Sequence, residues 1–333
     1  MKTSAIADAN IALVKYWGKR DQTLVLPQNS SISMVTDGLY AHTTVEFDSK
    51  YNRDIFSLNG KNIDTKSKGY EEYVGKFLKI VRKLSANKKH VRIQSSNNFP
   101  TAAGLASSAA GFAALTAATN KAFALGLNKR ELSILARQGS GSACRSIHSG
   151  FVEWRRGGKM DGSDSYAEQI ADAKYWPEFR MIFCITTKKE KKIKSRAGMA
   201  QTVATSAMYK CWLDAIVEDL KNVRQGIIQK SFSLVGKTAE HNCLKMHSLM
   251  LTTKPPIIYW NEFTIRIINK IIELRENGLE CYFTIDAGPQ VKIICLESNI
   301  PKIVRKVQEI TGIEDIIITK PGQGARIVNK HLF

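Results

Sequence analysis

Between residues 91 and 125 the sequence passes from a strand, through a loop of small residues, into an alanine-rich helix. Val91 to Ser95 alternates apolar and polar residues, as a half-buried strand does. Pro100 ends this regular structure, and Thr-Ala-Ala-Gly-Leu-Ala-Ser-Ser follows it directly. A helix that begins on such a loop presents unpaired backbone N–H groups and partial positive charge. The segment is typical either of a phosphate-binding loop or of a small-residue helix packed closely on a sheet.

The rest of the chain mixes predicted helices and strands, without an internal repeat or a long linker. The Walker pattern of phosphate loops is absent, so a phosphate loop here belongs to another type. Apolar periodicity predicts helices over 70–84, 131–137, 198–223, 239–250, 260–276 and 301–310, and strands over 41–47, 279–285, 291–296 and 315–319. The order of the last five elements predicts helices on one face of an antiparallel sheet, beyond a boundary near 186–191.

Composition limits the class of protein. A chain of 333 residues that is 44% hydrophobic can bury a large core in one or two domains, and it has no apolar run long enough to span a membrane. Its 49 Lys and Arg against 30 Asp and Glu give a net charge of +19, which suits nucleic acid, a membrane surface or phosphorylated small molecules. Six widely spaced cysteines and the lack of a signal-peptide pattern indicate a reducing cytoplasm, without a zinc site or disulfide framework.

Three further segments contain candidate functional side chains. Lys15 lies in an apolar, alternating segment, where it either meets a buried anion or extends from a strand edge to solvent. Arg145 follows Ser142 by three residues and offers a planar set of donors to a carboxylate or phosphate. Cys144 beside it is more typical of a small buried residue than of a nucleophile. Asp286 ends a predicted strand, either as a turn residue or as a catalytic base.

Taken together, these segments resemble the mevalonate diphosphate decarboxylase family of the GHMP kinase superfamily. The resemblance rests on NIALVKYWGKRD (10–21), LPQNSSIS (26–33), NNFPTAAGLASSAAGFAAL (97–115), GSGSACRSIHSGFVEW (139–154), KSRAGM (194–199) and TIDAGPQ (284–290). The segments occur in the family's order and span nearly the whole chain. The loop alone would indicate only the superfamily, whereas the first, fourth and last segments indicate the decarboxylase.

The resemblance implies a carboxy-lyase of the mevalonate pathway to isoprenoids and sterols. Such an enzyme phosphorylates the tertiary 3-hydroxyl of mevalonate 5-diphosphate with ATP and releases isopentenyl diphosphate, ADP, phosphate and CO2. It implies an α+β, two-domain GHMP kinase-like fold, with the active site in the cleft between the domains. Residues 1–187 would form a mixed α/β domain (ribosomal-protein-like) with the phosphate loop. Residues 188–333 would form a ferredoxin-like α/β sandwich that carries the catalytic Asp.

The resemblance also assigns roles to residues. Asp286 would contact the tertiary hydroxyl, Lys15 would neighbour this aspartate, and Arg145 would hold the substrate carboxylate. The implied substrate contacts are Tyr16, Lys19, Ser140, Ser142, Arg145, Ser195 and Arg196, and the implied ATP-binding loop is Gly104, Leu105, Ala106, Ser107 and Ser108. ATP would bring Mg²⁺, for which the sequence offers no carboxylate cluster and hence no assigned ligand. We expect a cytoplasmic homodimer with a small-molecule substrate, no specific nucleic acid and no membrane.

Three positions depart from the family's pattern, and several alternatives stay open. Asp8 stands where Pro is frequent, Lys194 where a second Ser is usual, and Gln290 where Asn is usual. The nearest alternative is a GHMP small-molecule kinase, or a decarboxylase acting on a related mevalonate phosphate. A basic nucleic-acid-binding protein is the alternative of another class, although aromatic residues make up only 8% of the chain. A catalytically inactive relative is the third.

Overall fold

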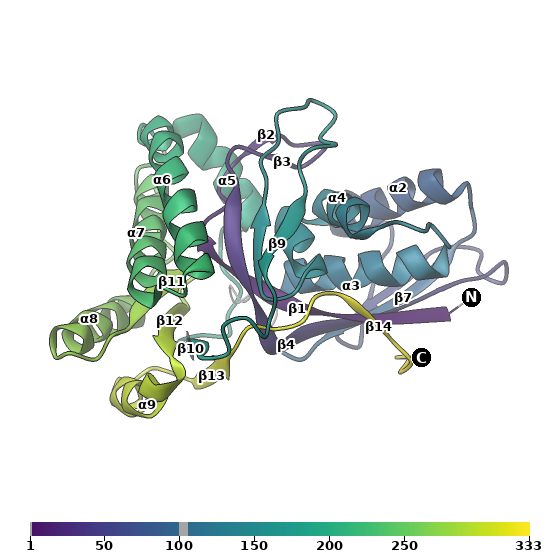
Figure 1. Cartoon of the computed structure of the whole chain (residues 1–333). Helices are drawn as coiled ribbons and strands as arrows, with labels where there is room; N and C mark the ends of the chain where they lie inside the picture. The colour runs from purple at the N-terminus through teal and green to yellow at the C-terminus, as the bar shows by residue number, and fades with distance from the viewer. Residues whose placement is uncertain (1, 100–105) are drawn as a thin grey trace.

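Two β-sheets organise the part of the chain that the computed structural model describes, residues 2–99 and 106–333 (Figure 1). The strands, in chain order, are β1 (Lys2–Val14), β2 (Lys19–Asp21), β3 (Leu26–Pro27), β4 (Ser31–Phe47), β5 (Ile55–Leu58), β6 (Lys61–Ile63), β7 (Val91–Asn97), β8 (Phe151–Trp154), β9 (Ala167–Ala171), β10 (Phe179–Ile185), β11 (Tyr282–Ile285), β12 (Val291–Leu296), β13 (Asp315–Thr319) and β14 (Arg326–Val328). The larger sheet runs β14-β1-β4-β7-β5-β6, with β8 and β9 continuing from β4, and the smaller runs β11-β12-β10-β13.

Helices pack against both sheets (Figure 1). They are α1 (Lys68–Tyr70), α2 (Lys76–Ser85), α3 (Ser107–Ala122), α4 (Lys129–Gly139), α5 (Ser195–Thr205), α6 (Tyr209–Ile228), α7 (Phe232–Leu251), α8 (Glu262–Glu276) and α9 (Ile300–Gln308), with a π-helical turn η1 (Glu71–Gly75) and 3₁₀ turns η2 (Gly141–Ile147) and η3 (Glu297–Asn299). Among the described residues, no helix has the length and apolar character needed to cross a membrane.

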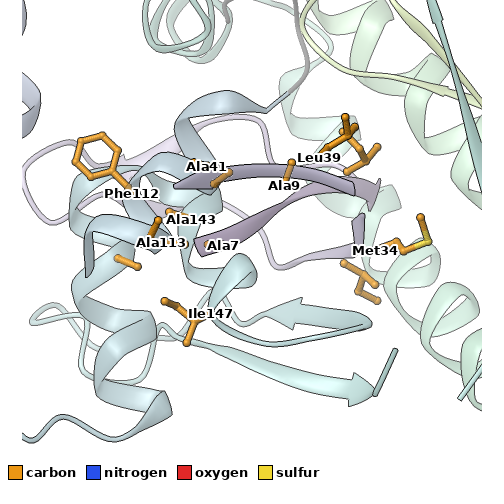
Figure 2. Packing of buried hydrophobic residues seen from close by; sticks show 14 of the residues in the cluster. Ala7, Ala9, Met34, Leu39, Ala41, Phe112, Ala113, Ala143 and Ile147 are labelled. Carbon is orange, nitrogen blue, oxygen red and sulfur yellow. The ribbon is translucent and has the colours of Figure 1, made fainter. Parts of the chain in front are cut away.

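Small side chains bring α3 close to the long strands β1 and β4. Ala7 of β1 and Ala41 of β4 are fully buried, as is Ala113 of α3 (Figure 2). Because these side chains end at Cβ, the helix can lie near the strand backbones, and its N-terminus is fixed relative to the end of β1. The α+β architecture predicted from the sequence is confirmed.

The smaller sheet is antiparallel throughout and buries both faces. Along β10, Met181, Phe183 and Ile185 join the main hydrophobic core, while Ile182 and Cys184 join a second core with apolar residues of α8 and α9. The prediction of helices on one face of an antiparallel sheet is confirmed for α8 and α9. Strand β10 precedes residue 187 yet pairs with β12 and β13, and β14 pairs with β1 of the larger sheet.

Several predicted elements have different bounds in the structure. The single helix predicted over 198–223 is wrong: α5 ends at Thr205 and α6 begins at Tyr209. Ser206 between them has an extended backbone, and its hydroxyl lies 2.8 Å from that of Thr252, so a tertiary hydrogen bond ends the helix. Strand β4 begins ten residues before the predicted 41–47, and Ser31 to Thr36 is buried on both faces.

Candidate active site

A cavity of about 420 Å³ lies where the two sheets meet. It is lined by Asn10, Ala12, Lys15, Tyr16, Trp17, Lys19, Tyr73, Ala106, Ser107, Ser108, Ser140, Gly141, Ser142, Arg145, Glu190, Lys191, Lys194, Ser195, Arg196, Met199, Met246, Asp286 and Ala287. The structure thus brings together every predicted site residue that it describes. The predicted loop residues Gly104 and Leu105 lie outside the described residues.

Asp286 is held between two lysines. The Nζ atom of Lys15 donates to Oδ1 at 2.7 Å, and Nζ of Lys292 lies 3.3 Å from Oδ2. Both lysine side chains are 1% exposed, whereas Asp286 keeps 27% of its surface exposed. Burial alone would raise the pKa of the Asp286 carboxyl, but the two ammonium groups outweigh it and hold this pKa below its usual range. The buried Lys15 therefore meets an anion and does not extend to solvent, and Asp286 is not simply a turn residue.

The backbone of Lys15 is held by two buried asparagines just beyond the end of β1. Asn242 on α7 accepts a hydrogen bond from the Lys15 N–H at 2.8 Å, and Asn29 donates to the Lys15 carbonyl at 2.8 Å. Asn242 also donates to Asp219, which pairs with Lys245 at 2.6 Å. These contacts replace the strand partners that the backbone has lost, so the lysine keeps a fixed direction.

Arg145 is a buried cation on the 3₁₀ turn η2. It is 3% exposed; its Nε donates to Oδ1 of Asn10 at 3.0 Å, and its Nη1 donates to the hydroxyl of Ser31. Among the described residues, no carboxylate forms an ion pair with Arg145 within 4.0 Å, and Asp286 of the same cavity pairs with Lys15 and Lys292 instead. Burial lowers the pKa of Arg145, which still leaves a guanidinium fully charged at neutral pH. The cavity therefore contains a buried positive charge that forms no direct ion pair with a carboxylate of the described residues.

Cys144 beside this arginine is a buried, free thiol, as predicted. Its Sγ donates to the Gly141 carbonyl, and burial raises its pKa to about 12. A thiol that stays protonated is a poor nucleophile.

The opposite wall carries further cations. Lys19 lies 3.2 Å from the amide oxygen of Gln22, and its pKa is lowered to about 8 by burial and then by Arg196 and Lys76. Arg196 stacks on the ring of Tyr73 at 3.7 Å and donates to the Gly139 carbonyl. The cavity lining has six Lys and Arg side chains against two carboxylates. Such a balance favours a polyanionic ligand.

Helix α3 begins at the edge of this cavity. Ala106 precedes it in a left-handed conformation, Ser107 is its first residue, and the Ser108 hydroxyl lies 3.3 Å from that of Ser140. The hydroxyl of Tyr16 is buried in the cavity wall without a hydrogen-bond partner among the described residues. The interpretation as a small-residue helix is confirmed, because α3 packs closely on the sheet. The interpretation as a phosphate-binding loop stays a prediction, which the place of the α3 N-terminus in the cavity lining supports.

The glycine within KYWGK has a steric reason. Gly18 adopts a φ of +113°, and a Cβ there would lie 1.8 Å from the hydroxyl oxygen of Tyr209. That hydroxyl donates to the Trp17 carbonyl at 2.8 Å. A side chain at this position would clash with Tyr209 and strain the backbone next to Lys19.

Sequence reasoning missed several residues of the site. Lys292 could not be predicted as a site residue, because the sequence does not show which partner an isolated Lys in an apolar strand has. Lys191 bonds the Ser195 hydroxyl at 2.7 Å and the Ala287 carbonyl, and burial lowers its pKa to about 8. Tyr73 and Asn10 also line the cavity. The charge run at 188–194 contains Lys191 but resembles an ordinary solvated surface, and Asn10 begins the first family segment without an assigned role.

The three departures from the family's pattern lie in different environments. Asp8 is 1% exposed and accepts hydrogen bonds from the Gln323 N–H and from Arg326, away from the cavity. Gln290 is fully buried and bonds the backbone of residues 186 and 187. Lys194 lines the cavity entrance and pairs with Glu190 at 3.5 Å. Asp8 therefore adds no acid to the anion site.

The described residues contain no group of three or more His, Cys, Asp or Glu side chains placed to hold a metal ion. The cavity offers serine hydroxyls at 107, 108 and 140 beside the start of α3. Mg²⁺ usually keeps several waters and is bound through substrate phosphates and one or two protein oxygens. This donor set fits a Mg²⁺ ion that is bound mainly by the phosphates of a nucleotide.

The fold and the cavity define a two-domain α/β enzyme of the GHMP kinase type, with a helix N-terminus, a lysine-flanked aspartate and a basic wall around one polyanion site. Comparison with known protein families places the chain more narrowly within this class. Residues 7–167 match the diphosphomevalonate decarboxylase-like N-terminal domain, and residues 181–321 match the mevalonate 5-diphosphate decarboxylase C-terminal domain. The chain belongs to the diphosphomevalonate decarboxylase family.

Individual relatives agree with this membership. Diphosphomevalonate decarboxylase of Danio rerio is 37% identical over 318 residues, which cover 91% of this chain and 78% of the relative. The crystal structure of mevalonate diphosphate decarboxylase from Staphylococcus aureus is 40% identical and superposes with a TM-score of 0.92 over 98% of both chains. A solved chain described as MDDEF in complex with MVAPP, AMPPCP and magnesium is 39% identical, with a TM-score of 0.92 over 99% of both chains.

Proposed function

We propose that this chain carries out the reaction of its family, the ATP-dependent decarboxylation of mevalonate 5-diphosphate to isopentenyl diphosphate, ADP, phosphate and CO2. The observation that supports this most strongly is the pair formed by Arg145 and Asp286 in one cavity. Arg145 is a buried cation that forms no direct ion pair with a carboxylate of the described residues, and Asp286 is a carboxylate kept ionised. The substrate supplies the two complementary groups, a carboxylate and a tertiary hydroxyl on neighbouring carbons.

Binding is the first task of the site. We assign Arg145 to the substrate carboxylate, with Ser140 and Ser142 beside it. Lys19, Arg196, Tyr16 and Ser195 are assigned to the diphosphate, for which they offer two cations and two hydroxyls. Anchoring the substrate at both ends places its tertiary hydroxyl between them, and holding reactants in this way removes much of the entropic barrier.

Asp286 then orients the tertiary hydroxyl. A carboxylate whose pKa lies below the usual range is a weak base, so it accepts a hydrogen bond from the hydroxyl without taking the proton in the ground state. The proton moves to it only as the γ-phosphoryl group of ATP forms a bond to the hydroxyl oxygen and the bond to ADP breaks. Lys15 offsets the charge that develops on the transferred group.

The phosphorylated intermediate decomposes without a further protein nucleophile. The C–O bond to phosphate breaks, positive charge develops at the tertiary carbon, and the C–C bond to the carboxylate supplies the electrons of the new double bond. Phosphate and CO2 leave.

ATP binds at the N-terminus of α3 in this proposal. Ala106, Ser107 and Ser108 face the cavity there, and we assign Gly104 and Leu105 to the same loop. A bound Mg²⁺ ion would neutralise phosphate charge, with the hydroxyls of Ser107 and Ser108 as the protein oxygens nearest to that end of the cavity.

We also propose a two-domain division, with the phosphate loop in the N-terminal domain and Asp286 in the C-terminal one, near the expected boundary at 187/188. The pairing of β10 with β12 and β13 supports assigning that strand to the second domain. A cytoplasmic location is supported by six free cysteines. A homodimer is proposed from the family resemblance.

The test is a paired assay with mevalonate 5-diphosphate and Mg-ATP, in which ADP and CO2 are measured in the same reaction. The proposal predicts equal amounts of both. Release of ADP without CO2 would instead establish a kinase that stops at the phosphorylated alcohol.

A further inference from the structure

Lys292 has no task in the mechanism described above, although it contacts the central aspartate. It lies on β12, opposite Thr284 of the neighbouring strand β11, and its side chain is 1% exposed. Its neighbours along the strand, Val291, Ile293 and Ile294, are fully buried apolar residues. Burying an ammonium group in such a strand is unfavourable, and an apolar residue would pack there with less desolvation. The position therefore calls for an explanation beyond the stability of the sheet.

We propose that Lys292 is a positioning residue for phosphoryl transfer. Lys292 and Lys15 each hold one oxygen of Asp286, which fixes the orientation of the carboxylate. The two lysines also make the net charge around Asp286 positive where the γ-phosphate approaches. This inference rests on the proposed function of the site. Lys15 contacts Oδ1 at 2.7 Å and Lys292 contacts Oδ2 at 3.3 Å. With a cation on each oxygen, the carboxylate cannot rotate without losing one of them, and its exposed part faces the cavity.

The charge balance explains why two lysines are needed. An isolated aspartate would repel the anionic phosphoryl group that must approach the hydroxyl beside it. One ammonium group cancels this repulsion, and the second turns it into attraction. Both charges act from buried positions, where salt and water screen them weakly.

Other titratable groups around Asp286 do not replace this contribution. His247 and Cys243 on α7 face the same aspartate and both lysines; burial lowers the pKa of His247 to about 3 and raises that of Cys243 to about 11, so both are neutral at physiological pH. Arg145 on η2 and Lys191 on the 186–194 segment are the other cations that act on Asp286. Arg145 is assigned to the substrate, and Lys191 bonds Ser195 and Ala287.

The test compares Lys292→Met with the matched control Arg180→Met. Arg180 lies on the adjacent strand β10 of the same sheet, is 9% exposed and pairs with Glu297 away from the cavity. We expect kcat of Lys292→Met to fall about a hundredfold and the KM for ATP to rise, with the KM for mevalonate 5-diphosphate nearly unchanged. The acidic limb of its kcat/KM profile should move to higher pH, because Asp286 loses one cation. Arg180→Met should lower only the thermal stability.

Lys292→Gln serves as a second variant, since it keeps a hydrogen-bond donor without the charge. It should behave like Lys292→Met. Wild-type kcat and an unmoved acidic limb in either variant, with only a lower melting temperature as in Arg180→Met, would overturn the proposal and make Lys292 a structural ion-pair residue.

Two readouts that need no turnover separate this inference from the proposed function. The first is a double-mutant cycle on unfolding free energy: Lys292→Met should be more destabilising in the wild type than in Asp286→Asn, which lacks the partner charge. The second is the affinity for AMPPCP, which Lys292→Met should weaken. If the wild type made neither ADP nor CO2, the proposed function would be refuted. The double-mutant cycle and the AMPPCP affinity would still show whether Lys292 pairs with Asp286 and supports nucleotide binding. Additive effects in the cycle, or unchanged AMPPCP affinity, would refute the inference itself.

Discussion

Removal of the Arg145 side chain gives the sharpest perturbation of the site. This guanidinium is 3% exposed, bonds only the uncharged side chains of Asn10 and Ser31, and has no carboxylate within 4.0 Å among the described residues. In the complex it would face the carboxylate of mevalonate 5-diphosphate. Truncating one partner of such a buried charge pair costs about 2–5 kcal/mol. The Arg145→Ala variant should therefore lose about 30-fold to 5,000-fold in kcat/KM.

The control is Arg137→Ala. Arg137 is equally buried, at 1% exposed, but it bonds the carbonyls of Gly162 and Ser165 and does not line the cavity. Both variants remove a buried guanidinium and leave carbonyl or hydroxyl groups unsatisfied, so both should lower the melting temperature. Only Arg145→Ala should lower kcat/KM, as measured by steady-state ADP release.

A binding comparison then tests the assigned partner. Isopentenyl diphosphate shares the diphosphate of the substrate and lacks its carboxylate. Calorimetric titration of Arg145→Ala should show weaker binding of mevalonate 5-diphosphate and nearly unchanged binding of isopentenyl diphosphate. Equal losses for both ligands, or wild-type kinetics, would refute the assignment of Arg145 to the carboxylate.

Three other outcomes follow from the geometry. Asp286→Asn should abolish turnover while AMPPCP still binds, because the substitution removes the carboxylate that takes the hydroxyl proton but removes no cation; loss of nucleotide binding would show that Asp286 is structural. The kcat/KM of the wild type should fall as pH rises through about 8, since Lys19 has a pKa lowered to about 8 and is cationic only below it; Lys19→Met should weaken binding at pH 7, and a Lys19→Met variant with unchanged KM would argue against the diphosphate contact. Burial raises the pKa of Asp8 to about 6, despite the opposing charge of Arg326, so the native state binds this proton more tightly than the unfolded chain does. The free energy of unfolding should therefore fall as pH rises from about 4 to 6. Chemical denaturation of Asp8→Asn should show a smaller fall, and a pH dependence identical to that of the wild type would count against Asp8 as its origin.

Local sequence signals predicted the elements whose structure is set locally. The helix predicted over 131–137 is confirmed as α4, which begins at an Asn128–Glu131 capping box, and β12 and β13 have the predicted bounds. Elements whose ends depend on tertiary contacts were harder to predict. The break after α5 depends on a hydrogen bond from Ser206 to Thr252, 46 residues away, which no local pattern reveals.

The candidate active site likewise contains residues that the sequence predicted and residues that only the tertiary structure reveals. The family resemblance named residues that the structure brings into one cavity from distant parts of the chain, and Lys15 and Asp286, 271 residues apart, form a direct hydrogen bond. Lys292 and Asn242 could not be predicted, because a buried polar residue is recognised by its partner and not by its spacing. The resemblance also explains only part of the net charge of +19, since the cavity lining has an excess of only a few cations.

An isotope experiment tests most directly the claim that the cavity activates the tertiary hydroxyl by phosphorylation. The wild-type protein would be given mevalonate 5-diphosphate labelled with ¹⁸O at the 3-hydroxyl, together with Mg-ATP, and the released phosphate analysed by mass spectrometry. The account predicts one ¹⁸O atom in each phosphate, because the hydroxyl oxygen leaves bound to the transferred phosphorus. Unlabelled phosphate, with the label in water, would contradict phosphorylation of the hydroxyl and the role given to Asp286.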